Sequence, residues 1–348
     1  MAQRKRLLLG VGIAFAVGVT LVVWGALRER MHADPLKNVP TSVRAVMWAK
    51  PVAVLDSPFL RAWTGVFGGD VSMAKVKELC GTNPLDSFER VTVFLGTEDG
   101  DRVGDFGYIA EGSIDRRSLV DCVRKLLEAD GSGVRRVDVD GHPGVAGMSG
   151  DSRAIFFGKR AVVGGTEALV RSVLDAVAHA DHAAAGATDL EALRAVVTPE
   201  SDVVVLLRVP ERWRKVVRTG AVLRFGVGFA DLGAMELVGL ALAFHDGLSL
   251  RMRAGFANDG QAKSLAEAAR RGMDLVRKSD AVAVSVAAPV LARTRVSAEG
   301  RFVTLETAAD ASEIEPLLRL VQKGMAPAPP VDAAGGADRN ASEPSNPR

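Results

Sequence analysis

Aromatic residues are scarce in this sequence of 348 residues, at 5 % of the chain, and Tyr108 is its one tyrosine. Surfaces that bind sugars or single-stranded nucleic acids usually stack their ligands on aromatic rings, so such platforms are disfavoured. The 44 basic and 42 acidic residues leave a formal net charge of only +2. A protein built to hold nucleic acid needs a strongly basic surface, and this balance argues against that class.

Cysteine and histidine are also rare, with two and five residues respectively. These are too few for a disulfide-dense scaffold or for a protein with several zinc sites. Hydrophobic residues make up 48 % and charged residues 25 % of the chain, which are ordinary values for a globular protein. At about 150 residues per domain, the length favours two domains.

One long uncharged run is present, from Leu7 to Leu27. As an α-helix its roughly 21 residues would span about 31 Å, the thickness of the hydrocarbon core of a bilayer. Trp24 lies near the far end, where an indole suits the membrane interface. No good cleavage site and no lipoprotein cysteine follow the apolar core. We therefore predict an uncleaved signal anchor rather than a cleaved signal peptide or a lipoprotein.

The short basic head of this anchor, Arg4–Arg6, favours a cytoplasmic N-terminus, although basic residues also follow the anchor. We expect a single-pass protein of the bacterial inner membrane, with residues 1–40 forming head, anchor and stalk and the bulk lying in the periplasm. Gly10, Ala14 and Gly18 form a small-xxx-small stripe that can pair two anchors in a homodimer. The alternative is that small residues are simply common in membrane helices.

The rest of the chain contains signs of an internal duplication. Ser42–Pro51 aligns without a gap on Ser201–Pro210, and Arg90–Gly100 parallels Leu237–Gly247. Each of the latter two segments ends in Asp-Gly, which is a hairpin turn signal. In each half, a returning strand leads to a helix, then to further strands and a last helix. The expected helices span residues 116–129, 166–178, 261–278 and 312–322, and the expected strands of the second half include 291–297.

These patterns predict an α+β fold with two tandem related units, residues 41–180 and 188–323. Each unit is expected to be an antiparallel sheet with helices packed on one face. The sequence leaves open whether the two units form separate sheets or one continuous sheet. Residues 324–348 are rich in proline, alanine, glycine and polar residues, so we expect a disordered tail.

Both cysteines fall on apolar helix faces of the first unit. Cys80 ends a helical pattern that Gly81 stops, and Cys122 shares a face with Leu119 and Leu126. In an oxidising compartment two such thiols can pair, and closing a loop of about 43 residues would stabilise the fold by roughly 4 kcal/mol in the chain-entropy model. The alternative is two buried free cysteines.

The segment Leu79–Asp86 contains a Cys-Gly-Thr-Asn-Pro turn, and after a strand and a hairpin the segment Gly112–Cys122 carries the second cysteine. This arrangement resembles a loose group of uncharacterised bacterial cell-envelope proteins, which pair a Cys-Gly-x-(Asp/Asn)-Pro turn with a later helical cysteine. The resemblance covers the first unit only, because the second unit lacks both cysteines. It implies export and a crosslink between the two cysteines, and it implies no activity.

Two groups of side chains are weaker candidates for binding. His179 and His182 lie at an expected helix end, one turn after Asp175, where such a face can hold a transition metal. Catalytic zinc motifs on helices usually use i, i+4 spacing with a nearby glutamate, so we expect an exposed linker and neither metal nor other cofactor.

The second group is basic and surrounds a tryptophan after Pro210. If this segment is helical, its apolar side lies beside cations and can meet anionic headgroups or an acidic partner. A solvated helix face is the alternative. The residues of this possible contact surface are Arg212, Trp213, Arg214, Lys215 and Arg218.

No recognisable set of nucleophile, base and orienting group is present in the sequence, so we do not expect an enzyme. The favoured hypothesis is a membrane-anchored envelope protein that binds or scaffolds a protein partner. The alternative is an apolar-ligand or lipid-handling domain, which a large pocket between sheet and helices would favour. An enzyme of unrecognised type is third, and a cleft that brings His142 together with acidic residues would favour it.

Overall fold

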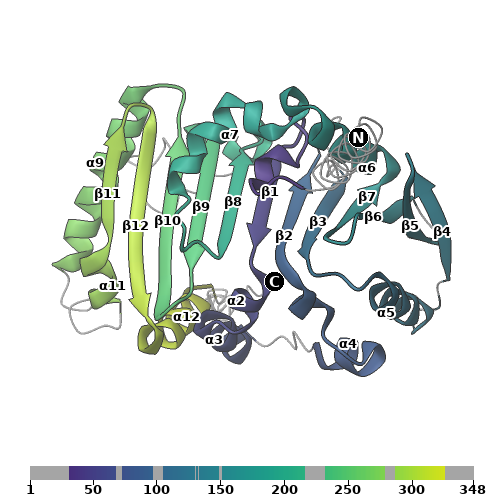
Figure 1. Ribbon diagram of the computed structural model, residues 1–348. Helices are drawn as coiled ribbons and strands as arrows, with labels where there is room; N and C mark the ends of the chain where they lie inside the picture. Colours follow the sequence, from purple (N-terminus) through teal and green to yellow (C-terminus); the bar gives the residue numbers. More distant parts are fainter. Residues whose placement is uncertain are drawn as a thin grey trace, which may run out of the picture.

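The computed structural model describes residues 31–67, 73–96, 105–129, 131, 133–148, 151–215, 232–278 and 287–325. Within these stretches the dominant feature is one sheet of twelve strands, and every neighbouring pair is antiparallel. The strand order is β11-β12-β10-β9-β8-β1-β2-β3-β7-β6-β5-β4, which Figure 1 shows from the yellow-green edge to the blue edge.

The first half of the chain forms one side of this sheet. Its strands are β1 (Ala45–Ala49), β2 (Phe88–Leu95), β3 (Phe106–Gly112), β4 (Val134–Val139), β5 (His142–Gly147), β6 (Ser152–Phe157) and β7 (Ala161–Thr166). Its helices are η1 (Pro35–Lys37), α2 (Pro51–Leu55), α3 (Pro58–Phe67), α4 (Met73–Cys80), η2 (Pro84–Ser87), α5 (Arg116–Ala129) and α6 (Glu167–Ala178).

The second half follows a link of short helices: η3 (Ala180–His182), η4 (Ala184–Gly186), α7 (Thr188–Leu193) and η5 (Arg194–Val196). Its strands are β8 (Val203–Arg208), β9 (Leu237–Ala243), β10 (Gly247–Gly255), β11 (Arg295–Glu299) and β12 (Phe302–Asp310). Its helices are α9 (Asp259–Arg277), α11 (Ala288–Arg293) and α12 (Ala311–Met325).

The two halves meet at the centre of the sheet, where β1 pairs with β8. Val46 lies opposite Leu206 and Trp48 lies opposite Val204. Both strands are rich in β-branched and large apolar residues, which suit a sheet covered on its faces. The α+β class and the antiparallel pairing are therefore confirmed, and the halves share one continuous sheet.

The main hydrophobic core lies on one face of the sheet, beneath α6 and α7. Val46, Phe94 and Ile109 from neighbouring strands are almost fully buried there. Val170 of α6 and Leu190 of α7 belong to the same cluster. These helices present apolar residues three or four positions apart, so each buries one stripe against the strands.

The opposite face of the sheet also carries helices. Gly239 of β9 faces α7 and η5, and its cross-strand partner Arg253 points to the same side. The next residue, Ala254, therefore points to the other side, where it packs with Leu265 of α9. A further cluster joins Ile314 of α12 to this opposite face.

The expectation that each unit carries helices on one face is therefore wrong. In the first half, α6 packs over Ile155, whereas the Arg116 side chain of α5 lies over the ring of the neighbouring Phe156. Strands such as β8 and β9 are apolar at nearly every position rather than at alternate positions. Both of their faces therefore need cover.

The predicted anchor, residues 7–27, lies outside the described residues, as does the part of the expected tail beyond residue 325. Among the helices of residues 31–325 that are described, none is long and apolar enough to cross a bilayer.

Candidate binding cavity

The first turn of α5 is set by Asp115. Its carboxylate accepts hydrogen bonds from the Arg117 backbone N–H at 3.0 Å and from the Ser118 hydroxyl at 2.7 Å. The Ser118 bond, followed by the Arg117 bond, lowers the pKa of Asp115 from its ordinary value. A carboxylate at this position satisfies free backbone N–H groups and interacts favourably with the helix dipole. Asp115 therefore determines where α5 begins.

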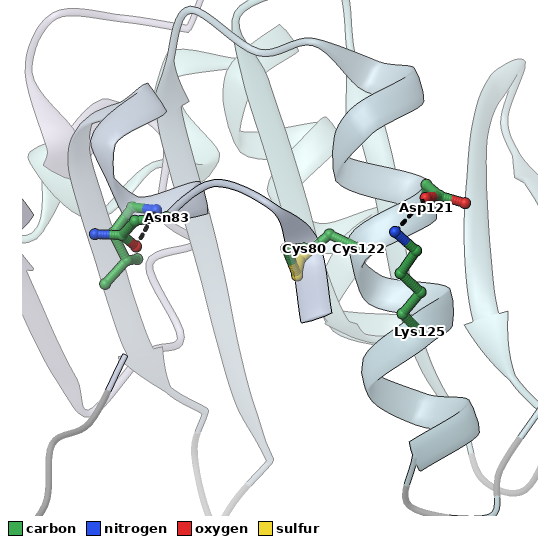
Figure 2. The surroundings of a disulfide bond; sticks show 6 residues. Cys80, Asn83, Asp121, Cys122 and Lys125 are labelled. Carbon is green, nitrogen blue, oxygen red and sulfur yellow. Dashed lines mark hydrogen bonds and ion pairs between the residues drawn. A yellow bond between two sulfur atoms is a disulfide. The ribbon is translucent and has the colours of Figure 1, made fainter. Parts of the chain in front are cut away.

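A disulfide holds the middle of α5. Cys80 at the end of α4 and Cys122 in α5 are joined with an Sγ–Sγ distance of 1.98 Å and a Cα–Cα distance of 4.7 Å (Figure 2). Beside it, Lys125 Nζ lies 3.1 Å from the Asp121 carboxylate on the exposed side of the helix. After α4 the chain turns at Asn83, whose side-chain oxygen accepts from the Leu85 N–H at 3.1 Å. The crosslink therefore ties α5 to the segment that leads into β2.

Between α5 and strands β4–β6 lies a cavity of about 630 Å³, which we name the α5 cavity. Small-molecule sites typically occupy about 300–1,000 Å³, so this volume is of the right size. Its apolar wall is built by Val120 of α5, Pro143 and Val145 of β5, and Phe156 of β6. Helix and sheet thus contribute facing apolar surfaces to one pocket that is open to solvent.

The remaining lining of the α5 cavity is mostly basic. Arg116, Arg117 and Arg124 come from α5, and Arg136 comes from β4. Among the described lining residues the one acid is Asp121, which forms an ion pair with Arg124. Four cations and one anion leave this lining with a formal charge of +3.

The cations of the cavity differ in their partners. Arg124 forms ion pairs with Asp121 and Glu128 of the same helix, so its charge is already balanced. The Arg116 guanidinium lies 4.8 Å from the centre of the Phe156 ring, a cation–π contact. Within the described part of the chain, no carboxylate lies within 4.0 Å of Arg116 or Arg136. These two guanidinium groups are available to an acidic ligand.

The guanidinium groups and the apolar wall of the α5 cavity suit different parts of a ligand. A planar guanidinium presents paired N–H donors that match a carboxylate or phosphate. The apolar wall suits a hydrocarbon chain, because burying such a chain removes apolar surface from water. Among the described lining residues there is no serine, cysteine or histidine that would act as a nucleophile or base. The described lining of the α5 cavity therefore combines guanidinium groups with an apolar wall.

The two histidines selected from the sequence are brought together around one carboxylate. His179 Nδ1 lies 3.0 Å and His182 Nδ1 lies 2.6 Å from the two oxygens of Asp175. The hydrogen bond between His182 and Asp175 raises the pKa of His182 and lowers the pKa of Asp175. His142, in contrast, stacks on Phe157 with ring centres 5.1 Å apart.

The basic surface selected from the sequence is described as far as Lys215, and Arg218 lies outside the described residues. Trp213 is 48 % exposed on a short helical segment that also contains Arg212. Arg214 lies 3.9 Å from Glu236, and Lys215 Nζ lies 3.4 Å from Glu211. The surface around Trp213 is therefore mixed in charge rather than uniformly basic.

The possible pairing stripe of the anchor, Gly10, Ala14 and Gly18, also lies outside the described residues.

The α5 cavity was not predicted from the sequence. A signal for one wall exists, because Arg116, Val120 and Arg124 recur every four residues and so form one stripe on α5. The opposite wall depends on β5, which was not predicted as a strand. Without β5 the sequence gives no surface for this stripe to face.

Comparisons with known proteins assign no family to the chain. No family model matches it, and no curated protein matches it. Among solved structures, crystal forms of TP0453 are similar to this chain at low TM-scores. Crystal form III has a TM-score of 0.47 at 9 % identity and covers 84 % of this chain and 100 % of its own. Form IV has a TM-score of 0.45 at 8 % identity, covering 83 % and 97 %.

Proposed function

We propose that this protein is a membrane-tethered, non-catalytic binding module for an anionic amphiphile, a molecule with one acidic headgroup and an apolar tail. The observation that carries the proposal is the α5 cavity, with its apolar wall and its cationic lining. The lining holds Arg116 and Arg136 without carboxylate partners among the described residues, so an acidic headgroup would neutralise charges that the fold leaves unpaired.

The tether is proposed from the sequence. The run Leu7–Leu27 supports an uncleaved anchor with a cytoplasmic N-terminus and a periplasmic bulk. The joined Cys80 and Cys122 are compatible with an oxidising compartment. Reporter proteins fused after Pro40 and after Gly324 test this orientation. Periplasmic activity at both points supports it, and reporters active only in the cytoplasm would overturn it.

The order of elements supports a further proposal, that the two halves descend from one duplicated unit. Each half begins with a central strand, β1 or β8, followed by an antiparallel hairpin, β2–β3 or β9–β10. Each hairpin leads to a helix, α5 or α9, and each half closes with a strand and a helix. The halves differ in the added hairpin β4–β5 and in the face that their last helix covers.

Photoaffinity labelling of the full chain in lipid vesicles tests ligand binding. The probes are a long-chain fatty acid that carries a diazirine and the matched alcohol, which lacks the acidic head. We expect the acid to label peptides of α5 and β5–β6 more strongly than the alcohol does. Because the headgroup would contact Arg116 and Arg136, the double variant Arg116→Gln/Arg136→Gln should lose most of this labelling.

The control for this experiment is Arg271→Gln, which removes an exposed cation of α9. It should leave the labelling of α5 unchanged. Equal labelling by acid and alcohol, or unchanged labelling in the double variant, would overturn the proposal.

A second candidate function is supported by Trp213, whose indole is 48 % exposed beside Arg214 and Glu211. Exposed tryptophans flanked by charges are typical of protein contact surfaces. Crosslinking in cells followed by mass spectrometry tests this function. A partner captured through Trp213 that is lost in Trp213→Ala supports it, and identical capture by both chains would contradict it.

A further inference from the structure

We propose that Asp175, His179 and His182 form a surface site for one divalent transition-metal ion of the zinc and cobalt class. The proposal does not depend on the proposed function, since this cluster contributes nothing to the lining of the α5 cavity. It rests on the convergence of three metal-ligating side chains on one point of the fold. One ligand atom from each residue lies within 4.8 Å of the others.

The distances within this cluster are close to those of a metal site. Zinc binds imidazole nitrogen and carboxylate oxygen at about 2.0–2.2 Å, which places tetrahedral ligand atoms about 3.4 Å apart. In the structure, the two imidazole Nδ1 atoms already lie 3.0 Å and 2.6 Å from the Asp175 oxygens. Their ring centres are 5.4 Å apart, with an interplanar angle of 46°. An ion between the three residues would replace these hydrogen bonds, and side-chain rotation would widen the N···O distances to about 3.4 Å.

The backbone holds the three ligands in place. Asp175 and His179 lie one turn apart at the end of α6, where the His179 N–H donates to the Asp175 carbonyl at 2.8 Å. His182 follows in the turn of η3, and its N–H donates to the His179 carbonyl at 3.0 Å. The sequence spacing of four and then three residues thus becomes one cluster because the helix ends in a tight turn.

An additional carboxylate supports a ligand role for His182. Its Nε2 atom lies 3.7 Å from the Asp181 carboxylate, on the opposite edge of the ring from Asp175. Histidines that bind a metal through one ring nitrogen usually donate the other N–H to a carboxylate, which fixes the tautomer and the ring orientation. At 3.7 Å this contact is longer than a hydrogen bond, so Asp181 would become a positioning residue once its side chain rotates closer. All three ligand side chains are exposed, so an ion reaches them from solvent and water completes its coordination.

The cluster lies where the link between the two halves is hydrogen-bonded to the segment before β1, so a bound ion would affect this junction. The His182 carbonyl accepts from the Thr41 N–H at 2.9 Å, and the Val39 carbonyl accepts from the Ala184 N–H at 2.7 Å. These bonds join the link between the halves to the segment that follows the predicted anchor. A bound ion would fix the turn of η3 and so stiffen this junction.

Metal titration of the full chain without an affinity tag tests the proposal. After treatment with a chelator, the protein is titrated with Co²⁺ and with Zn²⁺ by calorimetry, and the Co²⁺ ligand-field absorption reports the ligands. We expect one ion per chain and absorption typical of nitrogen and oxygen ligands. His179→Ala, His182→Ala and Asp175→Asn should each weaken binding by about tenfold or more, since each removes a direct ligand and even supporting residues are worth that much.

The matched control is His245→Ala, because His245 is also exposed and lies 4.0 Å from a carboxylate, Asp202. It should bind the ion with unchanged affinity. Thermal unfolding without metal shows whether each variant remains folded. If a histidine variant does not fold, Asp175→Asn still tests the site, because it keeps both imidazoles. Binding that is absent from the natural chain, or equal in the natural chain and all three ligand variants, would overturn the proposal.

Discussion

Arg208 joins three separate parts of the chain through one guanidinium group. Its Nε and Nη2 donate to the Asp189 carboxylate of α7 at 2.5 Å and 2.9 Å. Its Nη1 donates to the carbonyls of Thr41 and Val43, in the segment before β1. The hydrogen bond from Arg208 is the main reason why the pKa of Asp189 is lowered. This paired arrangement makes Asp189 a stabilising group only while it is ionised.

The variant Asp189→Asn should lower the free energy of unfolding by about 1 kcal/mol at neutral pH, because this pair is partly exposed and only the charge-assisted part is lost. A lowered pKa contributes stability above the pKa of the unfolded chain, and this contribution is lost as the pH falls through the folded value. The difference between the two chains should therefore begin to shrink when the pH falls below about 4, and it should vanish below the lowered pKa that Asp189 has in the folded chain. Denaturant titrations at several pH values measure it. Glu267→Gln, which breaks an exposed pair on α9, is the control and should change little.

Tyr108 gives a second prediction at this scale, since it is the one tyrosine of the chain. Its ring lies against Gly164, where an added Cβ would be 2.2 Å from the ring Cζ. Burial raises the pKa of Tyr108 above its ordinary value of 10.0. Because the unfolded chain releases this proton first, folding stability should fall as the pH rises above about 10.

Near-ultraviolet absorbance of tyrosinate follows this ionisation directly. We expect it to develop above the ordinary pKa of tyrosine and together with the loss of tertiary structure. Ionisation of Tyr108 near its ordinary pKa in a chain that remains folded would contradict the burial described for it.

At the scale of elements, turn chemistry and helix periodicity carry most of the predictable information. The expected helix 116–129 coincides with α5, and the end of β4 turns at Asp140 and Gly141 with φ values of 52° and 81°. A tight two-residue hairpin turn needs left-handed conformations at both residues, which Asp and Gly adopt readily, so the Asp-Gly pair indicates the turn between β4 and β5.

Two elements were not predictable from such local signals. β5 contains Pro143 and Gly144, which weaken a strand pattern, and it forms because β4 and β6 pair with it on both sides. The expected strand 291–297 overlaps α11, because Pro289 starts a helix there and the Thr294 hydroxyl donates to the Val290 carbonyl. A short apolar run fits strand and helix alike, so tertiary contacts decide.

The disulfide between α4 and α5 provides a prediction at the element scale. Cys80 and Cys122 are 42 residues apart, and removing their link should cost about 4 kcal/mol of unfolding free energy in the chain-entropy model. Denaturant unfolding with and without reductant measures the effect. The double variant Cys80→Ser/Cys122→Ser is the control, and it should not respond to reductant. A natural chain equally stable in both conditions would show that the crosslink contributes nothing to the fold.

At the scale of the whole molecule, the pairing of β1 with β8 is the feature that the sequence left open. Paired residues of these strands are more than 150 positions apart, and both strands are apolar except for Arg208 at the end of β8, so no local pattern reveals that they are partners. Lys50, which follows β1, forms an ion pair at 3.1 Å with Asp202, which precedes β8. The Asp202 carboxylate also accepts from the Phe244 N–H at 2.9 Å. The centre of the sheet thus belongs to both halves at once.

A substitution at this junction should therefore destabilise both halves together. Leu206 of β8 is fully buried, and Leu206→Ala should cost about 2–5 kcal/mol through lost burial and the cavity left behind. Amide hydrogen exchange should speed up in β2–β3 and β9–β10 alike. Leu275→Ala, at a position 72 % exposed on α9, is the matched control and should change exchange little. Faster exchange confined to the second half would mean that the halves unfold independently.

The most direct test of the proposed function is to identify the small molecules that co-purify with the full chain from its own membrane. Organic extracts of the purified natural chain and of Arg116→Gln/Arg136→Gln are compared by mass spectrometry. We predict that one acidic amphiphile is enriched, near one molecule per chain, with the natural protein and is depleted from the double variant. An extract without such a molecule, or the same molecule in equal amount from both chains, would contradict the account.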